Sequence, residues 1–264
     1  MKRIIVCMLF LCAAVVSLSK KPDRICRIAA YNVGVFSKYK DDSTMDIARM
    51  MLDSGVDAVA LCELDSCNLR HAAFQAMEFA EAMSADTMET PWSCRYGSAM
   101  QWNGGSYGTG VVTRSAMTDG FDIRIPKGNG YEPRVCVVAE TASYVIAAVH
   151  LDHSSEEVRM EQAGLVTDEL KRRYRRSRKP VFLCGDLNAT PDSPTLSLLS
   201  KDWDVLSAPS PTYPSHDPVK CIDYILALDN RARYKVIRTE VGCGTADISG
   251  YSDHLPVFVD IRIR

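Results

Sequence analysis

The stretch VFLCGDLNATPDSP, residues 181–194, joins a short apolar run to a polar loop. Four apolar residues, Val181 to Cys184, are typical of a buried strand. Asp186 and Asn188 follow directly, before the turn-forming residues around Pro191. Taken alone, these two side chains could belong to an ordinary loop. The stretch therefore predicts a buried strand whose end carries two candidate functional groups.

Polar side chains close other apolar runs in the same way. They are, in chain order, Asn32, Glu63, His150, Asp223 and the pair Asp253 and His254. Strand ends in α/β sheets gather functional side chains into one crevice. We therefore expect these residues to meet Asp186 and Asn188 in a single site.

Asp223 stands inside an apolar strand, between Ile222 and Ile225. A buried carboxylate is costly unless it is paired with a suitable partner. A histidine is the natural candidate, and a histidine backed by a carboxylate can move protons near neutral pH.

The acids of the expected site offer oxygen ligands without a Cys/His cluster. Glu63, Asp186 and Asp253 suit a hard ion such as Mg²⁺, which keeps several waters and binds a substrate phosphate. Mn²⁺ is the alternative ion. The pattern predicts metal-assisted chemistry on a phosphoester.

Apolar strand-like runs alternate with amphipathic stretches along the whole chain. The 264 residues are 47% hydrophobic, enough for one large core and one domain. We expect an α/β (α+β) fold in which two mixed sheets pack together and helices flank them. The expected strands are residues 25–33, 56–62, 109–113, 135–139, 144–149, 181–184, 221–227, 234–237 and 255–261.

Three helices are expected between these strands. The first has a capping box at Ser43 and Asp46 and ends at Gly55; the second covers residues 68–83. The third begins at Ser154, carries Leu165 and other apolar residues inward, and ends before Pro180. Its last part, residues 171–179, holds seven lysines and arginines, which favour a solvated helix end over a patch for nucleic acid or anionic lipid.

The first 19 residues have the features of a secretory signal peptide. Lys2 and Arg3 precede an apolar run from Ile4 to Leu18, and small residues precede Lys20. An uncleaved membrane anchor and a lipoprotein anchor at Cys12 fit less well. We expect residues 1–19 to be removed, residues 20–264 to form the functional domain, and the protein to be periplasmic or extracellular.

Export would leave eight of the ten cysteines, an even number that permits disulfides in an oxidising compartment. However, Cys62, Cys136 and Cys184 lie in strand-like runs, where a free cysteine acts as a small hydrophobe. The loss of Lys2 and Arg3 would change the net charge from −2 to −4. This charge is a weak signature for nucleic-acid binding.

Seven motifs together resemble the endonuclease/exonuclease/phosphatase superfamily, whose fold is that of deoxyribonuclease I, and its secreted bacterial branch. In order they are AAYNV, LCELD, YGTGVVTR, VHLDH, GDLNATPDSP, CIDYIL and YSDHLPV, spanning residues 32–257. GDLN followed by IDY and SDHLP is a specific combination.

The resemblance implies a role for each matched residue. Glu63 would hold the metal, with Asn32 and Asp253 completing or supporting its shell. Asp186 would activate the attacking water. Asn188 and His150 would hydrogen-bond phosphoryl oxygens, while Asp223 would orient His254 toward the scissile phosphate.

Four further residues are candidates for substrate binding. Tyr107 in GGSYG, residues 104–108, could reach the phosphate or belong to a hairpin turn. Asp152 and His153 could orient His150 or line the pocket, and His216 could face substrate or simply be exposed.

The expected activity is divalent-metal-dependent hydrolysis of phosphoesters, as a phosphodiesterase or phosphatase. The substrate could be a small molecule, a lipid headgroup or nucleic acid, because the fold alone does not choose among them. A secreted endo- or exonuclease and a non-catalytic binding module are the alternatives. No protein partner is implied, and we expect a monomer.

Overall fold

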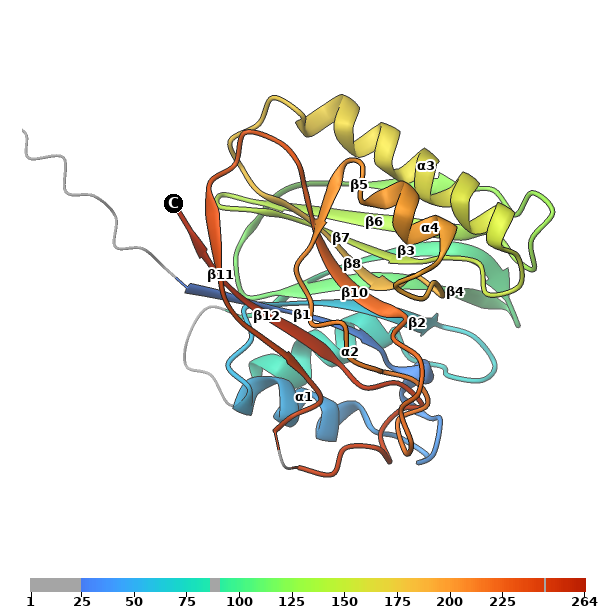
Figure 1. Cartoon of the computed structure of the whole chain (residues 1–264). Coiled ribbons are helices and arrows are strands. Elements are labelled where there is room, and N and C mark those ends of the chain that lie inside the picture. Colours follow the sequence, from blue (N-terminus) through green and yellow to red (C-terminus); the bar gives the residue numbers. More distant parts are fainter. Residues whose placement is uncertain (1–24, 86–90, 245) are drawn as a thin grey trace, which may run out of the picture.

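The computed structural model describes residues 25–85, 91–244 and 246–264; the leader expected at residues 1–19 lies outside this part. Two six-stranded sheets pack face to face, and helices cover both outer faces (Figure 1). The expected four-layer sandwich is therefore confirmed.

Each sheet contains one parallel pair of strands, β1 with β2 and β7 with β8, among antiparallel neighbours. The first sheet has the order β11 (Tyr234–Val241), β12 (Val257–Ile263), β1 (Ile25–Asn32), β2 (Ala58–Ser66), β4 (Gly105–Thr113) and β3 (Ser93–Trp102). The second has the order β5 (Met117–Ile125), β6 (Arg134–Thr141), β7 (Val145–His150), β8 (Val181–Asp186), β10 (Asp223–Leu228) and β9 (Trp203–Val205).

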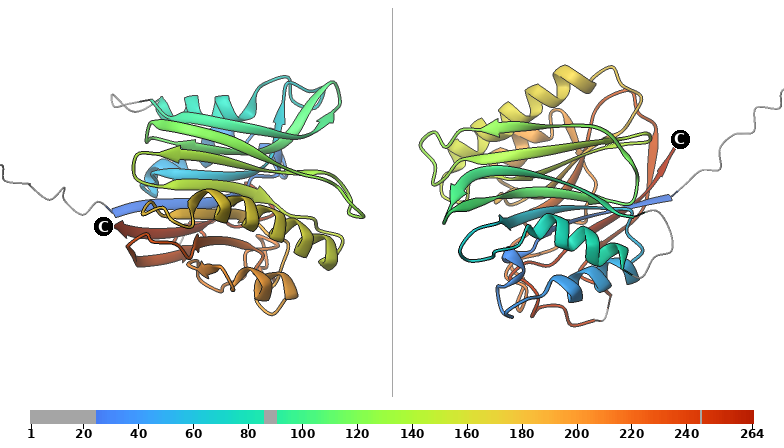
Figure 2. Two further views of the ribbon diagram at one scale, coloured as in Figure 1. Left: turned by 90° about the horizontal axis from the view of Figure 1, so that it is seen from above. Right: turned by 180° about the vertical axis from the view of Figure 1, so that it is seen from behind.

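The central core lies between the two sheets. Many of its side chains are small, including Ala30, Ala60, Ala148 and Ala227. Separate outer cores bury the helices α1 (Thr44–Asp53) and α2 (Gln75–Ser84) against the first sheet. They bury α3 (Glu156–Tyr174) and α4 (Pro194–Leu199) against the second, so each sheet has helices on its outer face (Figure 2). Because the central strands are covered on both faces, their sequences read as continuous apolar runs.

Helix α1 (Thr44–Asp53) follows the short 3-10 helix η1 (Gly34–Phe36) and buries Ile47, Met50 and Met51. Gly55 ends it with a positive φ of 70°. The expected capping box is absent, because the Ser43 hydroxyl donates instead to the carbonyl oxygens of Phe36 and Tyr251.

The second helix begins later than expected. Asn68 accepts hydrogen bonds from the backbone of Arg70 and His71, which folds residues 68–74 into a loop, so α2 is Gln75–Ser84. Helix α3 (Glu156–Tyr174) is capped by Ser155, and its Leu165 is 36% exposed rather than inward. A short helix, α4 (Pro194–Leu199), was not expected.

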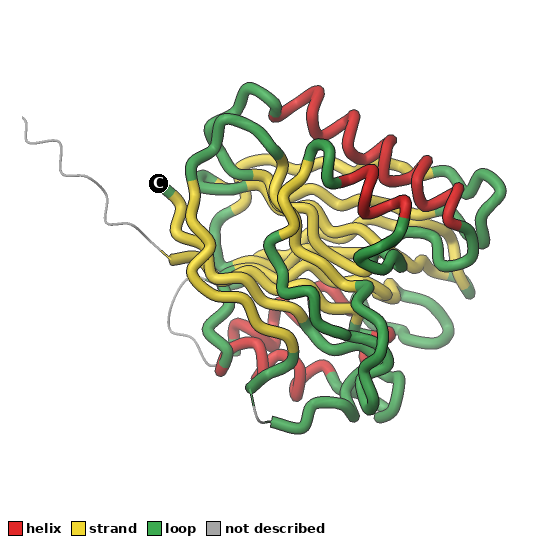
Figure 3. The backbone as a smooth tube through the Cα atoms, in the orientation of Figure 1, coloured by secondary structure: helices red, strands yellow, loops and turns green. Residues whose placement is uncertain are grey.

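The strand ends that carry functional residues gather at one rim of the sandwich, where several loops also meet (Figure 3). The register pairs Asn32 with Cys62 in the first sheet. In the second it pairs His150 with Asp186, and Asp186 with Asp223. The two sheets therefore present their polar ends to a common space.

Candidate active site

Strands β7, β8 and β10 place His150, Asp186 and Asp223 side by side, and all three are buried. Gly185 makes this close approach possible. Its φ is 140°, and a Cβ there would lie 2.0 Å from the carbonyl oxygen of Val149. The glycine of the GDLN motif is thus a steric requirement for the position of Asp186.

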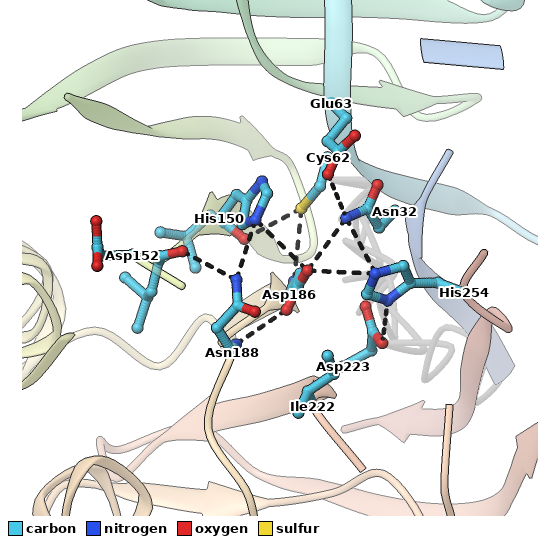
Figure 4. A network of polar contacts seen from close by, with 12 residues as sticks. Asn32, Cys62, Glu63, His150, Asp152, Asp186, Asn188, Ile222, Asp223 and His254 are labelled. Atoms are coloured by element: carbon cyan, nitrogen blue, oxygen red, sulfur yellow. Dashed lines mark hydrogen bonds and ion pairs between the residues drawn. The ribbon is translucent and has the colours of Figure 1, made fainter. Parts of the chain in front are cut away.

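His254 connects the two buried acids (Figure 4). Its Nδ1 lies 2.8 Å from Asp223 Oδ2, and its Nε2 lies 3.6 Å from Asp186 Oδ2. Thr212 also donates to Asp223 Oδ2, at 2.6 Å. The expected pairing of Asp223 with a histidine is therefore present in the structure.

Asn32 joins the acids of the two sheets. Its Nδ2 lies 3.0 Å from Glu63 Oε1 and 3.1 Å from Asp186 Oδ2. The pairing of β2 with β4 shifts between Leu61 and Leu64, and Glu63 has a φ of 60°. This bulge re-aims the Glu63 side chain toward Asn32.

Asn188 and His150 form the other side of the site. Asn188 is held with a φ of 50°, and its backbone N–H donates to Asp186 Oδ1 at 2.9 Å. Its Nδ2 lies 3.1 Å from His150 Nε2. Arg134 Nη1 lies 3.2 Å from the other ring nitrogen, Nδ1.

Burial and neighbouring charges shift the ionisation of these groups in opposite directions. Burial and the Asp223 carboxylate raise the pKa of Asp186. Burial lowers the pKa of His254, but Asp223 and Asp186 outweigh it and raise the net value. Burial, aided by Arg134, holds the pKa of His150 well below its usual value. Groups with divergent pKa values in one site are candidates for separate acid, base and donor roles.

The donor set fits a hard divalent ion. Glu63 and Asp253 offer carboxylate oxygens, the ligands that such ions prefer. The Asn32 amide oxygen accepts from the Gly34 N–H at 3.2 Å, so it would bind a metal through its second lone pair. The Lys38 ammonium lies 2.7 Å from Asp253 Oδ2, so a cation already balances this acid. Asp186, Asp223 and His254 also have ligand atoms within 4.8 Å of one another. A protonated histidine cannot be a metal ligand, and the raised pKa of His254 favours its protonated form. The set that contains Glu63 is therefore the better candidate for the metal site.

A cleft of about 590 Å³ opens over this network. The candidate residues that line it are Glu63, Tyr107, His150, His153, Asp186, Asn188, Asp253 and His254. Asn32 and Asp223 are almost fully buried and are not among the lining residues. His216 is not among them either, and its ring packs 5.0 Å from that of Tyr39.

The segment 104–108, GGSYG, also has the Gly-x-Ser-x-Gly spacing of an acyl-hydrolase nucleophile. It lies at the start of β4 in a hairpin rather than at a strand-to-helix turn. The Ser106 hydroxyl contacts the Tyr96 hydroxyl at 3.0 Å. This context does not fit a nucleophilic serine, whereas Tyr107 faces the cleft.

Asp152 is occupied by loop hydrogen bonds. Its Oδ1 accepts from Ser154 and Ser155, and its Oδ2 accepts from the Tyr131 N–H at 2.8 Å. Burial raises its pKa, but these bonds outweigh burial and bring the pKa to about 2. Asp152 therefore anchors the entry to α3 beside His150.

Replacing Asp152 with Asn should lower the free energy of unfolding by about 2 kcal/mol at pH 7. A depressed carboxyl pKa stabilises the fold fully above the ordinary value near 4, and this stabilisation is lost as pH falls toward 2. Urea unfolding of both proteins at pH 7 and pH 3 measures the effect. A difference that stays constant between these pH values would contradict the assignment.

Several residues that contact the site were not expected from the sequence. Among them are Lys38, Arg134, Thr212 and Ser252, whose hydroxyl donates to the Asn32 carbonyl at 2.6 Å. Ser252 directly precedes Asp253 in the YSDHLPV motif, so its place in the motif could have identified it as a residue near the site. The other three have no local signal, because long-range contacts bring them to the site.

A family model described as "Endonuclease/Exonuclease/phosphatase family" matches residues 29–254. The chain belongs to the endonuclease/exonuclease/phosphatase family. The match contains every predicted catalytic and metal-binding position, from Asn32 to His254. Membership of this family supports hydrolysis of phosphoester bonds, while no curated protein sequence matches the chain.

Solved structures of this fold resemble the chain at low sequence identity. An endonuclease/exonuclease/phosphatase from Beutenbergia cavernae DSM 12333 has a TM-score of 0.72 and 20% identity, over 91% of this chain and 72% of that one. A mannosyl-6-phosphatase from Bacteroides thetaiotaomicron VPI-5482 has a TM-score of 0.72 and 19% identity, over 89% and 99%. A 2′,3′-cyclic phosphatase has a TM-score of 0.68 and 12% identity, over 91% and 95%. They share the deoxyribonuclease I-like fold of this family member.

Proposed function

We propose that this protein is a divalent-metal-dependent hydrolase of phosphoesters. One observation carries the proposal: a buried polar chain runs from Asp223 through His254 to Asp186, and Asn32 links Asp186 to Glu63. This network of side chains borders a cleft. A phosphoester in the cleft would therefore meet the acid Asp186, the cationic donor His254 and the metal-binding carboxylate of Glu63.

Each residue has a role that its surroundings support. Asp186, whose pKa is raised, accepts a proton from the attacking water. His254, kept protonated by Asp223, donates to the phosphate and stabilises its developing charge. Asn188 and His150 hydrogen-bond phosphoryl oxygens. No covalent intermediate is required, because positioning and electrostatics suffice for an in-line attack.

Glu63, Asn32 and Asp253 would hold the metal, Mg²⁺ or Mn²⁺. A bound ion polarises the phosphoryl group and neutralises its charge. Replacing Glu63 with Gln should weaken Mn²⁺ binding by at least about ten-fold, since loss of a supporting partner alone costs roughly that much.

Titration of the Mn²⁺ electron paramagnetic signal measures this affinity without a substrate. Glu81→Gln, on the exposed face of α2, is the matched control and should bind as the wild type does. Equal affinity in Glu63→Gln and Glu81→Gln would place the metal elsewhere.

A small or lipid-linked phosphoester is the favoured substrate. Two proteins of the same fold are described as a mannosyl-6-phosphatase and a 2′,3′-cyclic phosphatase. The basic run at 171–179 does not argue for nucleic acid. Arg172 and Arg173 pair with Glu169. The run begins 15 residues after Glu156, the first residue of α3, which is about 22 Å along the helix from its start near His150. Extracellular nuclease activity remains the second candidate.

The activity is tested with residues 20–264 and four substrates: an aryl phosphate monoester, an aryl phosphodiester, sphingomyelin and plasmid DNA. Turnover should require Mg²⁺ or Mn²⁺, cease with a chelator and be lost in His254→Ala. Turnover of one class selects the substrate branch. No turnover with either metal would favour a non-catalytic binding module.

We also propose that residues 1–19 direct export. None of the helices in the described part of the chain has the length and apolar character that a bilayer crossing requires. Expression of the full chain in a bacterium, followed by fractionation and mass spectrometry, should find a periplasmic or extracellular protein that begins at Lys20. An intact N-terminus in the cytoplasmic fraction would refute export.

A further inference from the structure

Arg134 is a buried cation beside the site. It begins β6 and is 4% exposed. Its Nη1 lies 2.8 Å from Glu132 Oε1 and 3.2 Å from His150 Nδ1. Nη1 carries two hydrogens, so one can be donated to each partner.

The contact with Arg134 restricts the protonation of His150. A guanidinium has only donors, so Nδ1 must accept and therefore carries no proton. A neutral imidazole has one N–H, which must then be on Nε2. His150 is 6% exposed, so water does not readily replace Arg134 at Nδ1. This contact selects one of the two tautomers.

The Nε2–H of this tautomer points into the site. Asn188 Nδ2 lies 3.1 Å from Nε2 and donates to the Leu151 carbonyl at 3.1 Å, so Nε2 also faces a donor. Asp186 Oδ2, 3.5 Å from Nε2, is an acceptor, and no acceptor contacts Nδ1 among the described residues. The charged donor at Nδ1 and the acceptor at Nε2 together favour the proton on Nε2. Rotating the amide would bring two carbonyl oxygens together, so the observed orientation is the favourable one. Nε2–H and the second N–H of Asn188 are then two neighbouring donors, and they need a shared acceptor. Asp186 Oδ2 lies 3.5 Å from Nε2, and a phosphoryl oxygen in the cleft could accept from both donors.

The two histidines of the site have opposite partners at Nδ1. A carboxylate faces His254, and a guanidinium faces His150. The first arrangement favours an imidazolium with two donors. The second favours a neutral ring with a single donor at a defined atom.

We propose that Arg134, held by Glu132, is a positioning residue that fixes His150 as the Nε2–H tautomer and thereby aims one hydrogen-bond donor at the phosphoryl group. The identity of the acceptor rests on the proposed function, whereas the tautomer does not. Arg134 acts through His150 and need not touch the substrate.

The tautomer can be read directly in substrate-free protein by long-range ¹H–¹⁵N NMR of ¹⁵N-histidine samples. The chain has five histidines, and His150→Gln identifies the signals of His150. We expect an unprotonated Nδ1 and a protonated Nε2 between pH 6 and 8. A protonated Nδ1 in the wild type would overturn the proposal without any variant.

Variants separate positioning from general structure. Arg134→Met combined with Glu132→Gln removes the donor without leaving the half-buried Glu132 carboxylate unpaired. It should populate the Nδ1–H tautomer and lower kcat about ten-fold or more. The single variant Arg134→Lys keeps a cationic donor, so it should retain the Nε2–H tautomer and most of the wild-type activity. An unchanged tautomer in the double variant Arg134→Met with Glu132→Gln would refute the proposal. If the tautomers behave as expected but no phosphoester is hydrolysed, the proposed function fails and the role of Arg134 stands.

Discussion

Replacing Asp186 with Asn should lower kcat/KM by about 10³-fold, because an amide cannot accept the proton of the attacking water. The substitution keeps the shape of the side chain, and the amide oxygen can still accept from the Asn188 N–H. The loss of activity should therefore occur in a folded protein.

The stability of this variant separates chemistry from folding. The pKa of Asp186 is raised by burial and by Asp223, so its charged form is unfavourable in the folded protein. Asn removes that charge, which offsets the loss of about 1 kcal/mol for the hydrogen bond from Asn32. Urea unfolding at pH 7 should give a free energy within about 1 kcal/mol of the wild type.

Asp168→Asn, an exposed position on α3, is the matched control for both measurements. Full activity in Asp186→Asn would show that Asp186 does not accept the proton of the attacking water. Loss of activity accompanied by unfolding would mean that Asp186 acts through structure instead.

Replacing His254 with Gln should lower kcat by on the order of 10²- to 10³-fold, through loss of the cationic donor. It should also destabilise the protein by about 3 kcal/mol, because Asp223 is left buried without its charged partner. Thr212 alone would remain at Oδ2, and Oδ1 of Asp223 has no hydrogen-bond partner among the described residues.

The double variant His254→Gln with Asp223→Asn tests whether the two residues act as a unit. Asp223 acts through His254, so kcat should fall less than about ten-fold below that of the single His254 variant. Its free energy of unfolding should exceed that of the single variant, because the unpaired charge is gone. Additive losses in both kcat and stability would show that Asp223 has an independent role.

The sequence identified the central strands because each is covered on both faces and therefore reads as a local apolar run. The strand β8 is an example: it was expected at residues 181–184 and extends two residues further, to Asp186. Strands β3 and β5 were missed because they lie at sheet edges, where exposed and buried residues mix. Strand β9 is only three residues long.

The cysteines show the same dependence on local pattern. Cys62, Cys136 and Cys184 are buried, as their apolar surroundings indicated, and they are free thiols, which the sequence had left open. Cys62 lies beside the site, where its Sγ donates to the Val149 carbonyl at 3.2 Å. Nothing in the local sequence indicates that contact.

The sequence by itself determined the family, the four-layer fold and the chemical types at the site, because these depend on motifs and on short apolar runs. Only the tertiary structure decided how those groups meet. The bulge that re-aims Glu63, the buried pairing of His254 with Asp223 and the placement of Arg134 against His150 all depend on strand register and on chain segments far apart. Register and packing are set by the whole core, so a local stretch of sequence does not contain them.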